Sequence, residues 1–123
     1  AIAGKILAEA KELSERDSDI LVHVFSPGAD SKALDNALKQ LKAKAIMAFS
    51  VNEDTGKVLV LAKVDKTIVS KLKANEWVNQ ICSVIGGRGG GKDGQAQATG
   101  ESAEKLDDAV ALAEKLASSS ISA

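Results

Sequence analysis

Apolar positions follow two different patterns along this 123-residue chain, and these patterns predict its helices and strands. In four segments an apolar residue returns every three or four positions, which is the spacing of one buried helix face. We expect these helices at residues 1–16, 31–43 and 74–85, and a last helix that follows Ser102 and carries its apolar stripe at residues 106–117. Apolar runs of seven or eight residues are typical of buried strands. They lie at residues 19–25, 45–51 and 57–64.

Residue types that are preferred at helix ends mark several of these helix boundaries. Asp30 or Ser31 is expected to cap the second helix, and Ser102 the last one. Asp65 is expected to cap a short helical turn before the third helix. Gly86 follows that third helix directly, as a left-handed cap does.

The order of the predicted elements indicates one α/β domain. A strand, a helix and a second strand imply one crossover connection, and residues 52–56 form a hairpin loop to the third strand. Small and polar residues alternate at 95–99, as in a short edge strand. We predict a small mixed sheet of three to four strands flanked by helices. Residues 1–17 are expected to end a connecting helical arm, and 18–123 to form a single globular domain.

Composition excludes several kinds of site. The chain has two Phe, one Trp and no Tyr, so few aromatic side chains are available to stack on nucleic-acid bases. Its single cysteine, Cys82, and single histidine, His23, cannot build a zinc site of the usual kind. A lone cysteine also fits a reducing, cytoplasmic compartment. No run approaches the twenty apolar residues that span a membrane. We expect no catalytic residue, no metal ligand and no membrane contact.

Residues 86–100 read GGRGGGKDGQAQATG and hold seven of the ten glycines. Ordering such a segment costs ~1–2 kcal/mol per residue, which a ligand or a very tight backbone contact must offset. Bare N–H groups beside two cations, Arg88 and Lys92, suit an anion such as phosphate. We interpret 86–100 as a glycine-rich anion-binding loop, with a flexible linker as the alternative.

Two nucleotide-binding motifs are nearly matched in this segment, and both fail. Residues 86–93 almost spell a P-loop, but Asp93 occupies the place of the magnesium-binding Ser or Thr. Gly89, Gly91 and Gly94 match G-x-G-x-x-G, yet a helix precedes them where that motif needs a strand.

The net charge of −1 hides an uneven distribution. Residues 57–92 carry seven Lys or Arg and two acids, whereas residues 93–123 carry six acids and two lysines. A locally basic surface attracts a polyanion even on a nearly neutral protein. Ordinary solvated lysines are the alternative interpretation.

The glycine segment resembles a known family pattern. An amphipathic helix followed by a glycine-rich run, a cation, an Asp and Ala-Gln is similar to the C-terminal domain of alanyl-tRNA synthetase. That domain shares its fold with the accessory module of DHH-type phosphoesterases. The resemblance covers about residues 19–117, and Asp30, Leu34 and Leu38 also fit it. The motif positions are Gly86, Gly87, Gly89, Gly90, Gly91, Lys92, Asp93, Ala96, Gln97 and Gly100.

The resemblance implies a noncatalytic nucleic-acid-binding domain of alanine–tRNA ligase that binds the tRNA elbow to support aminoacylation and editing. Its partners would be tRNA(Ala) and the catalytic and editing domains of the same chain, with DNA and a homodimer as further partners. It implies no cofactor in this segment, because ATP, Mg and Zn would belong to other domains. The expected nucleic-acid-binding residues are Gly86, Gly87, Arg88, Gly89, Gly90, Gly91, Lys92, Gln95, Gln97, Lys71, Lys73, Lys39 and Lys42.

Two other functions stay open at this point. In a dimerisation module the glycine segment would pack on a twin subunit, with Trp77 either an interface anchor or a core residue. In a phosphoesterase fragment the catalytic half would be missing, because the chain has no DHH motif and too few metal ligands.

Overall fold

The structure is a computed structural model, and it describes residues 2–122. Residues 1 and 123, which the predicted first helix and globular domain include, lie outside the described residues. The elements in chain order are α1 (Ile2–Leu13), β1 (Ile20–Val24), α2 (Ser31–Leu38), β2 (Ala45–Asn52), β3 (Lys57–Val64), α3 (Ala74–Ile85), β4 (Arg88–Gly91), β5 (Gln95–Gly100), the 3₁₀ helix η1 (Ala103–Lys105) and α4 (Leu106–Ser122).

The strands form one mixed sheet in the order β1-β2-β3-β5-β4. β1 and β2 are parallel and are joined through α2, whereas every other neighbouring pair is antiparallel. The α/β class with a mixed sheet is therefore confirmed. The expected strand number was wrong, because the sheet has five strands and the glycine run supplies the additional one, β4.

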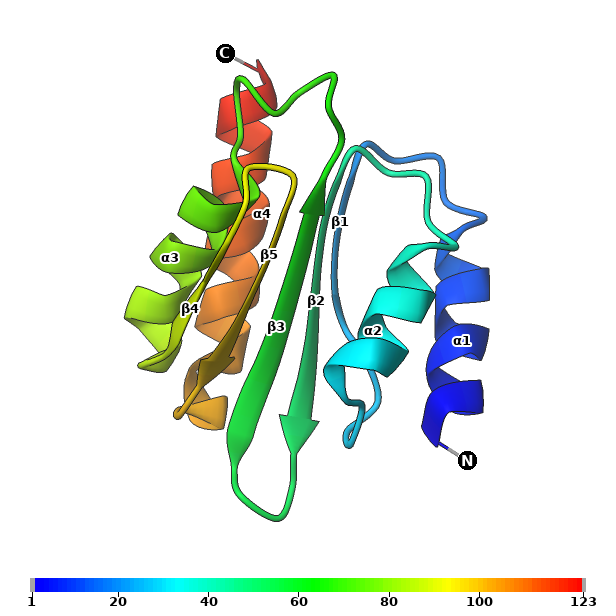
Figure 1. The fold of residues 1–123 in the computed structure, drawn as a ribbon, viewed down its shortest axis with the longest axis vertical. Coiled ribbons are helices and arrows are strands. Elements are labelled where there is room, and N and C mark those ends of the chain that lie inside the picture. Colours follow the sequence, from blue (N-terminus) through cyan, green and yellow to red (C-terminus); the bar gives the residue numbers. More distant parts are fainter. Residues whose placement is uncertain (1, 123) are drawn as a thin grey trace.

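Helices cover the two faces of the sheet in pairs. Figure 1 shows α1 and α2 on one face and α3 with α4 on the other. β2 is buried on both faces, so its side chains alternate between two cores. Met47 and Phe49 pack toward α3 and α4, whereas Ile46 and Ala48 pack toward α1 and α2.

Trp77 belongs to the core between α3 and α4. Its side chain is only 1% exposed, and its Nε1 donates a hydrogen bond to the carbonyl of Ala113 at 3.0 Å. Of the two roles considered for Trp77, the structure supports the core residue.

Several helix boundaries differ from the sequence prediction. The N-cap at Asp30 is confirmed, since its carboxylate accepts the N–H of Ala33. The predicted helix 31–43 ends at Leu38, and the residues up to Leu41 form single hydrogen-bonded turns. Ser102 makes no side-chain cap, and η1 separates it from α4. Asp65 accepts the N–H of Thr67 in a turn that does not become a helix.

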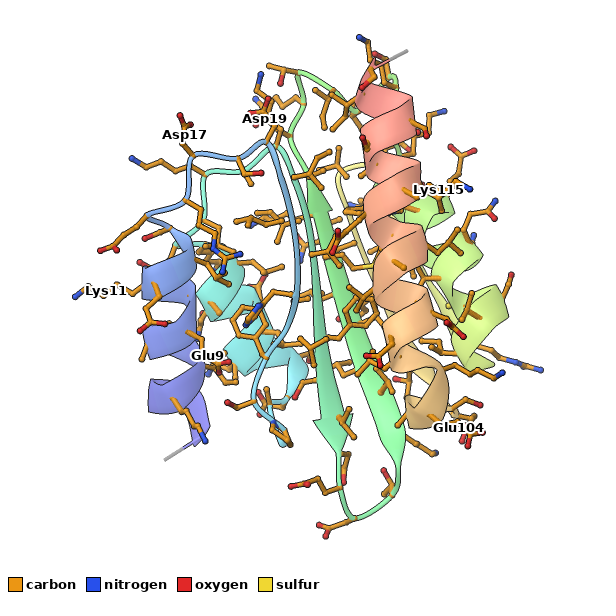
Figure 2. The ribbon with its side chains drawn as sticks, turned by 180° about the vertical axis from the view of Figure 1, so that it is seen from behind. Glu9, Lys11, Asp17, Asp19, Glu104 and Lys115 are labelled. Atoms are coloured by element: carbon orange, nitrogen blue, oxygen red, sulfur yellow. The ribbon has the colours of Figure 1, made fainter. Side chains whose placement is uncertain are left out.

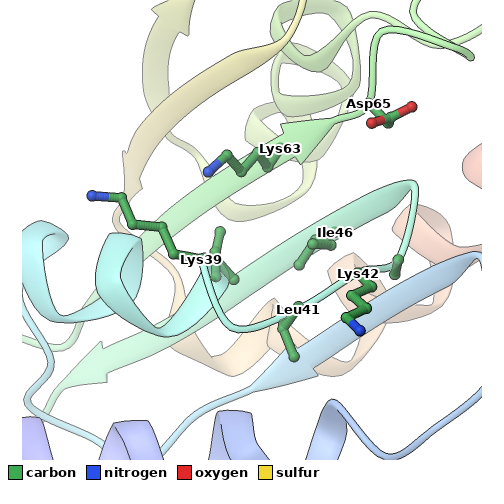
Figure 3. Close-up of a pocket in the computed structure, with 8 residues that line it drawn as sticks. Lys39, Leu41, Lys42, Ile46, Lys63 and Asp65 are labelled. Carbon is green, nitrogen blue, oxygen red and sulfur yellow. The ribbon is translucent and has the colours of Figure 1, made fainter.

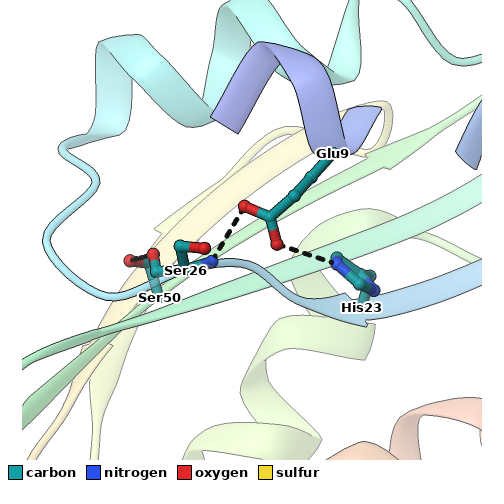
Figure 4. Close-up of polar contacts among 4 residues, drawn as sticks. All are labelled: Glu9, His23, Ser26 and Ser50. Carbon is teal, nitrogen blue, oxygen red and sulfur yellow. Dashed lines mark hydrogen bonds and ion pairs between the residues drawn. The ribbon is translucent and has the colours of Figure 1, made fainter. Parts of the chain in front are cut away.

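α1 packs on the sheet through an apolar stripe and one carboxylate. Ile6, Ala10 and Leu13 are at most 3% exposed and belong to the core that includes α2. Glu9 accepts the backbone N–H of Ser26 at 3.1 Å and lies 3.5 Å from Nε2 of His23 (Figure 4). His23 is thus half-buried where α1 packs against β1. That α1 also ends a longer helical arm stays a prediction.

Candidate nucleic-acid interface

The glycine segment is a β-hairpin. β4 pairs with β5 in antiparallel register, with Gly89 opposite Ala98 and Gly90 opposite Gln97. The N–H of Lys92 donates to the carbonyl of Gln95 at 2.7 Å and closes the turn. The expected open loop is therefore wrong, because part of the backbone that we had assigned to an anion is used in strand pairing.

Both ends of this hairpin are tied to the rest of the domain. At the turn, the carbonyl of Asp93 accepts the N–H of Ala74 at 2.7 Å, the first residue of α3. The neighbouring carbonyl of Gly94 accepts from Val64 at 2.9 Å. At the other end, the N–H of Glu101 donates to the carbonyl of Ile85 at 2.9 Å. These bonds exclude the flexible-linker interpretation.

Close backbone approach explains three of the seven glycines of this segment. A Cβ on Gly87, Gly89 or Gly91 would come within 3.0 Å of the backbone of β5. Gly86 caps α3 with a φ of 64°, in the left-handed region that favours glycine. A tight backbone contact therefore offsets the cost of ordering this segment, as one of our two explanations required.

Gly90 is the exception among the five glycines of residues 86–91. It has no positive φ, and a Cβ built on it would meet nothing within 4 Å. Glycine in a strand is unfavourable because it loses more conformational entropy on folding and packs no side chain. The fold of the described residues gives no reason for glycine at position 90.

Beside Gly90, one face of the sheet is left open. Gln95, Gln97 and Thr99 are exposed on β5, while Ala96 and Ala98 face the core with α3. Opposed residues of an antiparallel pair share a face, so Gly90 lies with Gln97 and Arg88 lies with Thr99. We call this surface, formed by these five residues, the hairpin face. Of the predicted residues of β4 and β5, it brings together Arg88, Gly90, Gln95 and Gln97. Gly89 and Gly91 lie opposite Ala98 and Ala96, on the other face of the sheet.

A shallow groove of about 510 Å³ runs from the hairpin face toward the start of α2. Gln97 and Thr99 line one side of it, and Leu59 of β3 lies between them and α2. Its lining combines polar groups with the apolar side chains of Ala29 and Leu59, which suits a ligand that carries hydrogen-bonding groups.

The predicted lysines are divided between the two faces of the sheet. Lys39 and Lys42 line a hollow at the end of α2, on the side of the hairpin face (Figure 3). Lys71 and Lys73 line a different hollow between α3 and α4. The structure therefore does not bring Lys71 and Lys73 together with Lys39 and Lys42.

Sequence reasoning missed Lys63. This residue of β3 lies opposite Gln95 of β5 and lines the same hollow as Lys39. The available signal was its position, two residues after Leu61 on the face that α2 covers. The long-range pairing that places it beside Gln95 has no signature in the local sequence.

The acidic groups near these lysines are few. Asp35 pairs with Lys39 at 3.4 Å and accepts a hydrogen bond from Nε2 of Gln95 at 3.2 Å. Asp65 lies at the far end of the hollow (Figure 3). Hydrogen bonds from the hydroxyl and then the backbone N–H of Thr67 hold the pKa of Asp65 below its usual value. Asp65 is therefore a carboxylate at neutral pH.

Among residues 2–122, no group of three or more His, Cys, Asp or Glu side chains is arranged to hold a metal ion. Within the same residues, no helix is long and apolar enough to cross a membrane.

Comparison with known proteins identifies the family. The family model of the DHHA1 domain matches residues 17–119. The chain belongs to the DHHA1 domain family. The matched residues run from the loop after α1 into α4 and include the whole sheet and the glycine hairpin.

Relatives of this DHHA1 domain carry a consistent name. It is 63% identical over 125 residues to "Alanine--tRNA ligase, cytoplasmic" of Caenorhabditis elegans, and 41% identical over 129 residues to the protein of that name of Drosophila melanogaster. The alignments cover 98% and 99% of this chain. The chain spans 13% of the length of each of these relatives.

A solved structure supports the same relationship. The C-Ala domain of alanyl-tRNA synthetase from Aquifex aeolicus superimposes with a TM-score of 0.71 at 27% identity. The match covers 81% of this chain and 91% of that domain. The resemblance drawn from the glycine motif is thereby confirmed.

Proposed function

We propose that this DHHA1 domain is the noncatalytic tRNA-binding domain of an alanine–tRNA ligase. It binds the outer corner, or elbow, of tRNA(Ala) and so supports aminoacylation and editing by other domains of the same chain. The names of the relatives support the ligase, and the match to a C-Ala domain supports an accessory role. The activity of the whole ligase lies outside the segment described here.

One observation carries the proposal, namely the bare surface at Gly90. Its missing side chain serves no contact within the domain, so we assign it to a ligand that approaches the backbone of β4 directly. Folded RNA presents phosphates, 2′-hydroxyls and loop bases to such a surface. Gln97 lies opposite Gly90 and supplies an amide that donates and accepts hydrogen bonds.

Charge supports the same surface. Arg88 and Lys92 are exposed at the two ends of β4, and Arg88 forms no ion pair among the described residues. β4 is also an edge strand, so the outward N–H groups of its backbone have no strand partner. Cations and unpaired N–H groups contact phosphates without reading a base sequence. Shape and charge then select the tRNA elbow.

The proposal also covers the cofactors, the location in the cell and a second ligand of this domain. This domain needs no cofactor, since ATP, Mg and Zn would serve other domains of the ligase. We place it in the cytoplasm, as the names of the first relatives do for those proteins. DNA is a further ligand that the hairpin face could accept, because phosphate contacts do not distinguish sequences.

A gel-shift comparison tests the proposal with three ligands: tRNA(Ala), an RNA hairpin that lacks the elbow, and duplex DNA. We expect the tightest binding to tRNA(Ala). Gly90→Val should weaken it about tenfold or more without lowering stability, because the new side chain blocks close approach. Gly4→Ala is the matched control, since a Cβ on Gly4 also meets nothing within 4 Å. Equal binding of Gly90→Val and wild type contradicts the proposed site.

Arg88→Ala gives a second readout. Loss of one phosphate contact should reduce the slope of log affinity against log salt by about 0.7–0.9. An unchanged slope removes Arg88 from the interface.

The free edge of β4 favours one alternative, a homodimer. A second copy could pair with this edge and extend the sheet. Light scattering at low and high protein concentration distinguishes the two functions. A strict monomer that binds tRNA(Ala) excludes the dimerisation module.

A further inference from the structure

The hollow at the end of α2 contains a lysine in an unusual position. Lys63 is half-buried and lies on the face of β3 that α2 covers, where the two preceding residues on the same face are Leu59 and Leu61. Its neighbours across the sheet are Ile46 on one side and Gln95 on the other. An apolar residue would continue the pattern, so the fold alone does not favour a cation here.

The residues that line this hollow come from α2, the loop after it, β2, and the end of β3. Figure 3 shows the ammonium groups of Lys39 and Lys63 extended to the same side, whereas Lys42 points away from both. Leu38 and Ile46 are at most 4% exposed and lie beneath these lysines. The hollow has a volume of about 420 Å³ and is open to solvent. It can receive a ligand from outside without a rearrangement of the core.

The charge of Lys63 is not neutralised within the domain. Among residues 2–122 it forms no ion pair, while Asp35 is paired with Lys39 and hydrogen-bonded to Gln95. Asp65 lies at the other end of the hollow, where Lys44 and Lys66 act on it. A half-buried stem restricts the rotamers of Lys63, so a ligand would cost it less side-chain entropy than an extended surface lysine.

We propose that Lys63 and Lys39 bind a phosphodiester of the same RNA that contacts the hairpin face. Gln95 joins the two places, because it is opposite Lys63 and belongs to the hairpin face. Lys63 is the central cation, since Lys39 shares its charge with Asp35. The inference rests on the proposed function and adds a second anchor, about two strand spacings from β4.

The test compares wild type with Lys63→Gln in a salt titration of tRNA(Ala) binding. The substitution keeps the length of the side chain and removes its charge. We expect affinity to fall about three- to tenfold at low salt, and the salt slope to fall by about 0.7–0.9. Lys63→Arg should restore both quantities, because it restores the charge. Thermal melts of each variant establish that the fold is intact.

Lys115→Gln serves as the matched control. It changes an exposed lysine on α4, on the other side of the molecule (Figure 2). It should leave the salt slope at the wild-type value. A Lys63→Gln variant with the wild-type slope, or a Lys115→Gln variant with an equal loss, overturns the proposal.

The same experiment separates this inference from the proposed function. If wild type binds tRNA(Ala) and the elbow-less hairpin equally, the elbow assignment fails. A lower slope for Lys63→Gln on either RNA still supports the phosphate anchor. If wild type binds neither RNA nor duplex DNA, both proposals are overturned.

Discussion

The two edges of the sheet are built in opposite ways. β1, at one edge, has four apolar side chains and His23, and is covered by α1 on one face and α4 on the other. β4, at the other edge, is Arg-Gly-Gly-Gly, and all four of its residues are exposed. Burial of side chains holds β1, whereas β4 is held by backbone pairing with β5 and by the absence of Cβ atoms. The edge that lacks side chains is the one left accessible to a ligand.

The largest expected effect on the free energy of unfolding comes from a substitution that removes side-chain packing next to β1. Phe25 follows this strand directly and is 2% exposed, so Phe25→Ala should lower the free energy of unfolding by about 3–5 kcal/mol. Urea unfolding followed by circular dichroism measures the change. Leu7→Ala is the control, because Leu7 is 40% exposed and its loss should change stability by less than about 0.5 kcal/mol. Similar losses in both variants would contradict the role given to burial at this edge.

At β4, neighbouring glycines should differ sharply. Gly89→Ala forces a Cβ against the backbone of Gln97 and should cost about 1–3 kcal/mol. Gly90→Ala meets no atom and should leave stability unchanged, or raise it by about 0.4–1 kcal/mol. Thermal or urea unfolding of both variants gives the comparison. If Gly90→Ala destabilised as much as Gly89→Ala, position 90 would be structural and its assignment to a ligand would fail.

A smaller effect concerns the carboxylate that ties α1 to β1. Glu9→Ala leaves the half-buried N–H of Ser26 without its acceptor, which should cost about 1 kcal/mol. Glu9→Gln keeps an oxygen that accepts this bond and should cost less. The difference between the two variants in urea unfolding isolates the hydrogen bond from the charge facing His23. Equal losses would assign the whole effect to the charge.

The smallest expected effect is on the local opening of β4, which the alkylation rate of the Cys82 thiol can report. Cys82 is 8% exposed and lies beside Gly87 and Gly89, and burial raises the pKa of its thiol. Both properties should make alkylation slow at pH 8, because the thiolate is the reacting form. Gly89→Ala should accelerate it by loosening the hairpin, whereas Gly90→Ala should not. Alkylation followed by mass spectrometry measures both rates, and equal acceleration would contradict separate roles for the two glycines.

The sequence predicted the elements whose apolar side chains form a helical stripe or a continuous run. Residues 45–51 and 57–64 became β2 and β3, and 74–85 became α3 with its left-handed cap at Gly86. β4 could not be found in this way, since strand patterns are read from side chains and three of its four residues have none. The early end of α2 and the missing cap at Ser102 depend on tertiary contacts.

The candidate site was predictable to a similar extent. The motif indicated the segment that carries Arg88, Gly90 and Gln97, and the register brings them to one face. It did not separate the glycines that pairing requires from Gly90, because that distinction depends on distances to β5. Lys63 was missed for the same kind of reason, since only the sheet order places it beside Gln95.

The placement of α1 and of β4 at opposite edges sets a minimum width for any molecule that touches both. Four gaps of about 4.8 Å separate β1 from β4, a span of ~19 Å. A single nucleotide seated at Arg88 is too small to reach α1. A folded RNA is large enough to bridge the domain from side to side, and the rigid sheet would hold its two points of contact at a constant separation.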